Sequence, residues 1–122
     1  MKIRIIITLL GGLTLAGCYY DREEDLYPPP GNCETTNVTY SATIVPLLQN
    51  YSCNSCHSGP APSGNISLDN YTGVKAVALN GKLFGAISHS AGFSPMPQGG
   101  NKLSACNIDK VKAWIDAGAP NN

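Results

Sequence analysis

The stretch Cys53-Asn54-Ser55-Cys56-His57 decides how the rest of this 122-residue chain is interpreted. Two thiols three residues apart lie close together on one side of a helical turn. The residue that follows them adds an imidazole. These three side chains are therefore expected to act together at one site.

The C-x-x-C-H pattern is the signature for covalent attachment of a c-type haem. In such a site the thiols of Cys53 and Cys56 add to the two vinyl groups of the haem. His57 then becomes a ligand of the iron, because a proximal histidine is one of the standard haem ligands. The motif predicts one covalent haem c as the cofactor of this chain.

Paired cysteines at this spacing also occur in thioredoxin-like dithiols and in zinc sites. A thioredoxin-like dithiol needs a βαβ context, and the Gly- and Pro-punctuated sequence does not show one. A closed zinc site needs four ligands. The other candidate ligands are single residues far apart in the sequence: Cys33, His89 and Cys106.

Residues 1–17 have the pattern of an export leader. Lys2 and Arg4 form a basic start, and residues 5–15 are mostly apolar. That apolar run is too short for a permanent membrane span and fits the central region of a signal peptide. The Leu-Ala-Gly-Cys sequence ending at Cys18 resembles the lipobox of bacterial lipoproteins, which implies cleavage and a lipid on Cys18. An ordinary signal peptide cut near a cysteine is the alternative.

Residues 18–32 are interpreted as a tether between this lipidated cysteine and a compact domain at 33–122. Residues 21–25 are strongly charged, and three prolines at 28–30 favour an extended spacer. The expected location is therefore outside the cytoplasm, on the periplasmic face of a bacterial membrane or on the cell surface, with the lipid as anchor.

Cys33 and Cys106 remain once Cys18, Cys53 and Cys56 have been assigned. Two leftover cysteines in an exported protein suggest a disulfide, since such compartments are oxidising. A pair of buried free thiols is the alternative.

Charge is close to balanced over the expected mature chain. Cleavage before Cys18 leaves six basic and eight acidic side chains, a formal charge of −2. A nucleic-acid-binding surface needs clustered Lys and Arg. We therefore expect no nucleic-acid partner.

The periodicity of apolar residues predicts helices and no convincing strand pair. The expected helices lie at 44–51, 73–80 and 82–88, with a last one between Ser104 and Gly118. Their expected N-caps include Thr43, Thr72 and Ser104. Gly81 and Gly118 are expected to end the helices before them. The last helix should bury Ile108, Val111 and Ile115 on one face, with Trp114 flanking that face as a core residue.

In this order the chain resembles the class I cytochrome c family over nearly all of residues 33–122. The stretch at 114–120, Trp-Ile-Asp-Ala-Gly-Ala-Pro, and the Met96-Pro97 dipeptide resemble small bacterial cytochrome modules that are often lipoproteins. The resemblance implies an all-α fold in which three to four helices and long Gly/Pro-rich loops surround one covalently bound haem. It also implies that the last helix packs across the first.

The resemblance further implies a second axial ligand and a carbonyl partner for His57. Met96 is the expected sixth iron ligand, because prolines on both sides restrict its backbone, and His89 is the alternative. In the family a backbone carbonyl shortly after the motif accepts the hydrogen bond of the proximal histidine. The neighbourhood of Pro60 and that of Pro62 are equal candidates here.

The expected function is transfer of single electrons between redox proteins of an electron-transfer chain, by a membrane-tethered monohaem protein with His57 and Met96 on the iron. It is not expected to be an enzyme. The alternatives are a haem enzyme or gas sensor for peroxide, O₂ or NO with an open or labile sixth position, and a haem subunit of a larger respiratory complex.

Overall fold

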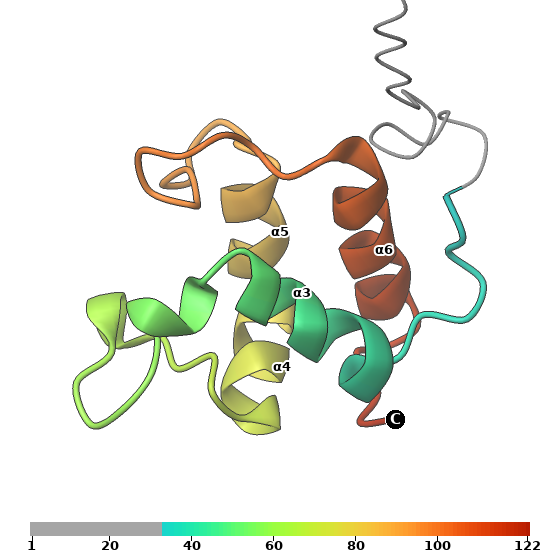
Figure 1. The fold of residues 1–122 in the computed structure, drawn as a ribbon, viewed down its shortest axis with the longest axis horizontal. Helices are drawn as coiled ribbons and strands as arrows, with labels where there is room; N and C mark the ends of the chain where they lie inside the picture. Colours follow the sequence, from blue (N-terminus) through green and yellow to red (C-terminus); the bar gives the residue numbers. More distant parts are fainter. Residues whose placement is uncertain (1–32) are drawn as a thin grey trace, which may run out of the picture.

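The computed structural model describes residues 33–122 (Figure 1). In this part of the chain the structure is all-α, as expected, and holds no strand. The elements in order are η1 (Tyr40–Ile44), α3 (Val45–Asn50), η2 (Cys53–Ser55), η3 (Ser63–Asn65), α4 (Tyr71–Leu79), α5 (Lys82–Ile87) and α6 (Ala105–Asp116).

The predicted leader at 1–17, the lipidation site Cys18 and the tether at 18–32 lie outside the described residues. Among residues 33–122, no helix has both the length and the apolar character needed to cross a membrane.

The first helix begins earlier than the sequence predicted. Thr39, and not Thr43, is the N-cap: its side-chain oxygen accepts a hydrogen bond from the Ala42 N–H at 3.1 Å. The chain then makes one wide π turn, η1, before it continues as α3. Pro46 lies in the first turn of α3. A proline has no N–H to donate and its ring needs room beside the preceding turn, which explains the wide turn before it.

The second helix, α4, is also capped by a different residue from the one expected. Asn70 accepts from the Gly73 N–H at 2.9 Å, so the helix starts at Tyr71 and Thr72 lies inside it. A β-carbon on Gly73 would lie 2.1 Å from the carbonyl oxygen of Ser67, so only glycine allows this close approach. Gly81 has a φ of +81° and separates α4 from α5, as expected of a helix-ending glycine.

The last helix, α6, begins and ends as predicted. The Ser104 side chain accepts from the Asn107 N–H at 3.3 Å. At the other end, Gly118 has a φ of +89° and donates to the Ile115 carbonyl, while the Ala119 N–H donates to that of Trp114. These two bonds form a Schellman motif, which satisfies carbonyls that the helix leaves unpaired.

Trp114 is a core residue, as predicted. Its side chain is 0% exposed, its ring stacks on Tyr40 at 5.7 Å, and its Nε1–H donates to the Pro120 carbonyl at 2.9 Å. Ile115, which was expected on the buried face, is half-buried. The core also joins the other helices, since Ile44, Val74 and Val111 are almost fully buried.

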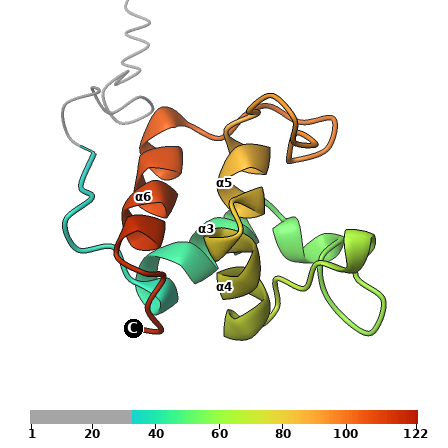
Figure 2. The ribbon, with the colours of Figure 1, turned by 180° about the vertical axis from the view of Figure 1, so that it is seen from behind.

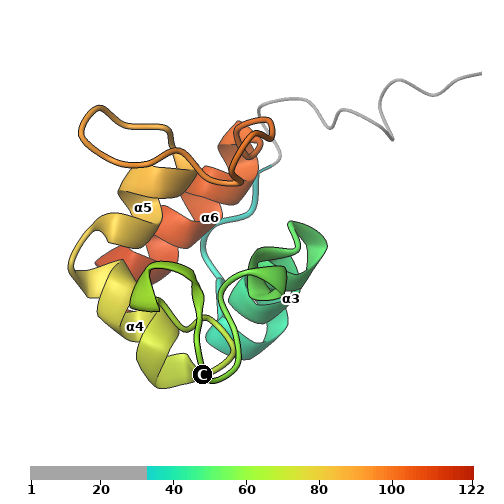
Figure 3. The same cartoon turned by 90° about the vertical axis from the view of Figure 1, so that its left-hand side faces the viewer.

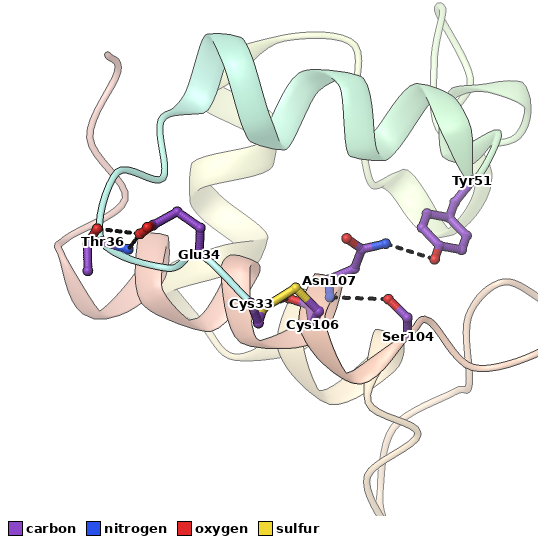
Figure 4. The surroundings of a disulfide bond; sticks show 7 residues. All are labelled: Cys33, Glu34, Thr36, Tyr51, Ser104, Cys106 and Asn107. Atoms are coloured by element: carbon purple, nitrogen blue, oxygen red, sulfur yellow. Dashed lines mark hydrogen bonds between the residues drawn. A yellow bond between two sulfur atoms is a disulfide. The ribbon is translucent and has the colours of Figure 1, made fainter. Parts of the chain in front are cut away.

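The helices pack as a small bundle with α6 against both α5 and η1 (Figures 1 and 2). A disulfide joins Cys33, before the first helix, to Cys106 in the first turn of α6, with an S–S distance of 2.07 Å (Figure 4). Beside it, the Asn107 side-chain amide donates to the Tyr51 hydroxyl at 3.0 Å. The start of α6 is thereby tied to the chain that precedes the first helical segment and to the residue that follows α3.

Candidate functional site

The C-x-x-C-H motif follows α3 directly and folds into a single tight turn. Ser52 takes a left-handed backbone conformation with a φ of +54°, which ends the preceding helix and starts η2. The N–H groups of Cys56 and His57 both donate to the Cys53 carbonyl, at 3.3 and 3.1 Å. These two hydrogen bonds place Cys53, Cys56 and His57 on one turn of the backbone.

Cys53 and Cys56 are both free thiols. Cys56 is exposed, whereas Cys53 is half-buried, and burial raises the pKa of the Cys53 thiol. Cys33 and Cys106 are bonded to each other and are not available as partners for a zinc ion. Across residues 33–122, no three His, Cys, Asp or Glu side chains gather into a group able to hold a metal ion.

The imidazole of His57 is oriented by two backbone carbonyls. Its Nδ1 lies 3.1 Å from the Ser63 oxygen and 3.2 Å from the Ile66 oxygen. A carbonyl only accepts hydrogen bonds, so Nδ1 carries a proton, and in the neutral ring Nε2 then carries the lone pair. Of the two prolines considered, Pro62 is the neighbour of one acceptor. Ile66 was not foreseen, because no residue type marks a backbone acceptor in a loop.

The loop that supplies these carbonyls is tied back to the motif. The Ser63 N–H donates to the Cys56 carbonyl at 2.9 Å, and the Leu68 N–H donates to the His57 carbonyl at 2.7 Å. The carbonyls of the loop therefore accept the hydrogen bond of the imidazole N–H, and its N–H groups hold the backbone of the motif in place.

Asp69 closes the same loop at its far end. Its carboxylate accepts from the Gly59 N–H at 3.0 Å, from the Ser67 hydroxyl and from the Asn70 amide. These hydrogen bonds, with that from Ser67 the largest contribution, lower the pKa of the Asp69 carboxyl. Asp69 was not singled out from the sequence; an Asp next to the helix-capping Asn70 is the signal that was available.

Met96 lies half-buried in the long loop between α5 and α6. Its N–H donates to the Ala86 carbonyl at 3.0 Å, and its own carbonyl accepts from His89 Nε2 at 3.1 Å. The two candidate sixth ligands are therefore neighbours joined by a hydrogen bond. The Met96 sulfur lies outside that bond, whereas the Nε2 of His89 is engaged in it.

Phe93 holds the same loop against α5. Its ring lies over Gly85, where an added β-carbon would come within 2.4 Å of the ring atoms. Gly85 itself is buried, and the Ser90 N–H donates to its carbonyl at 2.9 Å. Because Gly85 has no side chain, the Phe93 ring can pack directly on the surface of α5.

The C-x-x-C-H turn and the Met96 loop lie on the same side of the molecule. Both are at the left of Figure 1, the turn in green and the loop in orange, and both face the viewer in Figure 3. Two free thiols, and an imidazole whose Nδ1 is the nitrogen hydrogen-bonded to the protein, are the residue types that a covalently attached haem requires. The residues present therefore fit that group.

No protein-family model matches the chain, and searches of curated proteins and of solved structures find no match either.

Proposed function

We propose that this chain is a membrane-tethered monohaem c-type cytochrome, with a fold like that of the class I family, that transfers single electrons between redox partners. The observation that carries the proposal is the state of His57. Its Nδ1–H is engaged by two carbonyls of a neighbouring loop, so that Nε2 is the available ligand atom, and the two cysteines of the same turn are free thiols.

The two thiols would form the covalent attachment. Each S–H would add across one vinyl C=C bond, with sulfur bonding one carbon and the hydrogen going to the other, so that no leaving group is needed. Both cysteines must be reduced for this addition. Neither is in a disulfide, and the oxidised pair of the described domain is formed by Cys33 and Cys106.

His57 and Met96 would be the axial ligands. The hydrogen bonds at Nδ1 fix the ring orientation and increase the basicity of Nε2, as contacts behind a metal ligand generally do. His89 is the weaker candidate because its Nε2 is already bonded to the Met96 carbonyl. A Met/His pair raises the reduction potential relative to other ligand sets.

The haem, when bound, supplies one-electron redox chemistry. With His57 and Met96 both holding the iron, a substrate would find no ligand position left there. The role of the chain is then to hold the ligands in place in both redox states and to limit access of water.

Lipidation of Cys18 would hold the domain at the periplasmic face of a membrane or at the cell surface, with residues 19–32 as a spacer. Brief contacts with redox proteins suit such a carrier, since interfaces of electron-transfer encounters are small.

An optical spectrum of the purified holoprotein, ferric and ferrous, with and without CO, tests this function. We expect low-spin iron in both states, the weak red band of ferric iron–methionine ligation, and no CO adduct. Met96→Ala should lose the red band and bind CO. High-spin iron or a CO adduct in the wild type would contradict the carrier role and support the gas-sensor or enzyme alternative.

A further inference from the structure

We propose that His89 is a positioning residue for Met96: its imidazole fixes the Met96 peptide so that the thioether is presented to the iron. This inference rests on the proposed function, and it assigns to His89 a role other than iron ligation. It concerns the position of the Met96 backbone, which follows from two hydrogen bonds within the described domain.

The Met96 peptide is held on both sides. Its N–H donates to the Ala86 carbonyl at 3.0 Å, and its carbonyl accepts from His89 Nε2 at 3.1 Å. Ala86 and His89 belong to the C-terminal end of α5 and the residues that follow it. Because both of its backbone groups are hydrogen-bonded, the thioether side chain is the part of Met96 that remains free to bind the iron.

The backbone of His89 supports the same role. Its φ of +54° lies in the left-handed region, where a non-glycine residue is uncommon. Glycine adopts this conformation without a steric penalty, and Gly92 and Gly99 do so in the same loop. Histidine is enriched among the non-glycine residues that adopt it, and at this position the ring hydrogen-bonds to the Met96 carbonyl.

The chemistry of the bond requires only a proton on Nε2. A carbonyl oxygen accepts, so the imidazole is the donor, and both the neutral ring with hydrogen on Nε2 and the imidazolium provide it. Any side chain with an N–H at the same reach should therefore replace His89.

Two variants separate the hydrogen bond from the backbone strain. His89→Gln places an amide N–H near the position of Nε2, whereas His89→Leu fills a similar volume without a donor. Both keep a β-carbon at the same positive φ, so their difference reports the hydrogen bond. Two readouts are made on the full chain: amide hydrogen exchange of Met96, and the rate at which cyanide replaces the methionine ligand on ferric iron.

We expect His89→Leu to speed both Met96 amide exchange and cyanide entry by about fivefold, the factor that corresponds to a typical net hydrogen bond. His89→Gln should restore both to within about twofold of wild type. Wild-type rates in His89→Leu would overturn the proposal, and so would equal rates in the two variants.

The two proposals fail in different ways. A protein without covalent haem would refute the proposed function, and the positioning of Met96 toward iron with it, whatever the exchange rates. Normal haem attachment and a normal red band, with no effect of His89→Leu, would refute the role of His89 alone. A wild type without the red band, together with CO binding by both His89→Gln and His89→Leu, would show His89 to be the ligand and would also overturn the inference.

Discussion

His57 is held by backbone carbonyl groups, which no sequence motif identifies. The motif predicted the imidazole, the two thiols and their proximity. It did not identify the carbonyls of Ser63 and Ile66 as the partners of Nδ1, because every residue has a carbonyl and the path of the loop decides which one reaches the ring. Likewise, His89 was considered as a ligand, and its bond to the Met96 carbonyl became evident only from the fold.

Asp69 gives the loop behind His57 a defined dependence on pH. The pKa of its carboxyl is lowered in the folded protein, chiefly by the Ser67 hydroxyl and the Gly59 N–H. A group with a depressed folded pKa stabilises the fold above its unfolded pKa, which is about 3.9 for Asp. That contribution is lost as the pH falls through the lowered, folded value.

We therefore predict that Asp69→Asn lowers the denaturant midpoint near neutral pH, and that its difference from wild type shrinks below about pH 4. Denaturation of both proteins at a series of pH values measures it, and the comparison cancels other groups that titrate in the same range. A difference that stays constant down to the lowest pH would show that the Asp69 hydrogen bonds add no stability.

At the scale of the helices, the sequence predicted which helices exist and in what order, but it did not predict where the first helix and α4 begin. Polar residues capable of capping occur in clusters before both helices. Thr39 precedes Thr43, and Asn70 precedes Thr72. The periodicity of apolar residues does not distinguish caps a few residues apart. The structure selects the one whose backbone is extended and whose oxygen reaches the free N–H groups. The single cap before α6, Ser104, was identified directly.

The pair Asn70 and Thr72 tests this correction. Asn70→Ala should lower the free energy of unfolding by about 1 kcal/mol, because it removes the acceptor for the Gly73 N–H. Thr72→Ala should have little effect, since Thr72 is exposed inside α4 and alanine is the better helix former. Chemical denaturation measures both. If Thr72→Ala were the more destabilising change, the capping residue would be misassigned.

At the scale of the whole molecule, the described domain has only a small hydrophobic core to stabilise it. It spans residues 33–122, and its core is a single cluster around Trp114. The sequence predicted an all-α domain and placed Trp114 in the core. It did not predict that this side chain would be fully buried, since that depends on Tyr40 and Pro120 closing over it from the two ends of the domain. Small cores of this kind usually need covalent reinforcement.

The Cys33–Cys106 disulfide is one such reinforcement. It closes a loop over a sequence separation of 73 residues. On the chain-entropy model, removing it by Cys33→Ser with Cys106→Ser should reduce the free energy of unfolding by about 4 kcal/mol. Denaturant titration of the oxidised wild type and the double variant measures this, with the spectrum of the bound haem checking that the site is retained. An unchanged midpoint would show that the bond does not restrain the unfolded chain as assumed.

The central claim is that Cys53 and Cys56 attach one haem covalently. The most direct test is the intact mass of the denatured full chain, expressed in a bacterium able to attach c-type haem, beside Cys53→Ala, Cys56→Ala and the paired variant. We predict that the wild-type mass includes exactly one haem that survives denaturation, that each single variant loses most of it, and that the paired variant carries none. A denatured wild-type mass equal to that of the polypeptide alone would contradict the account.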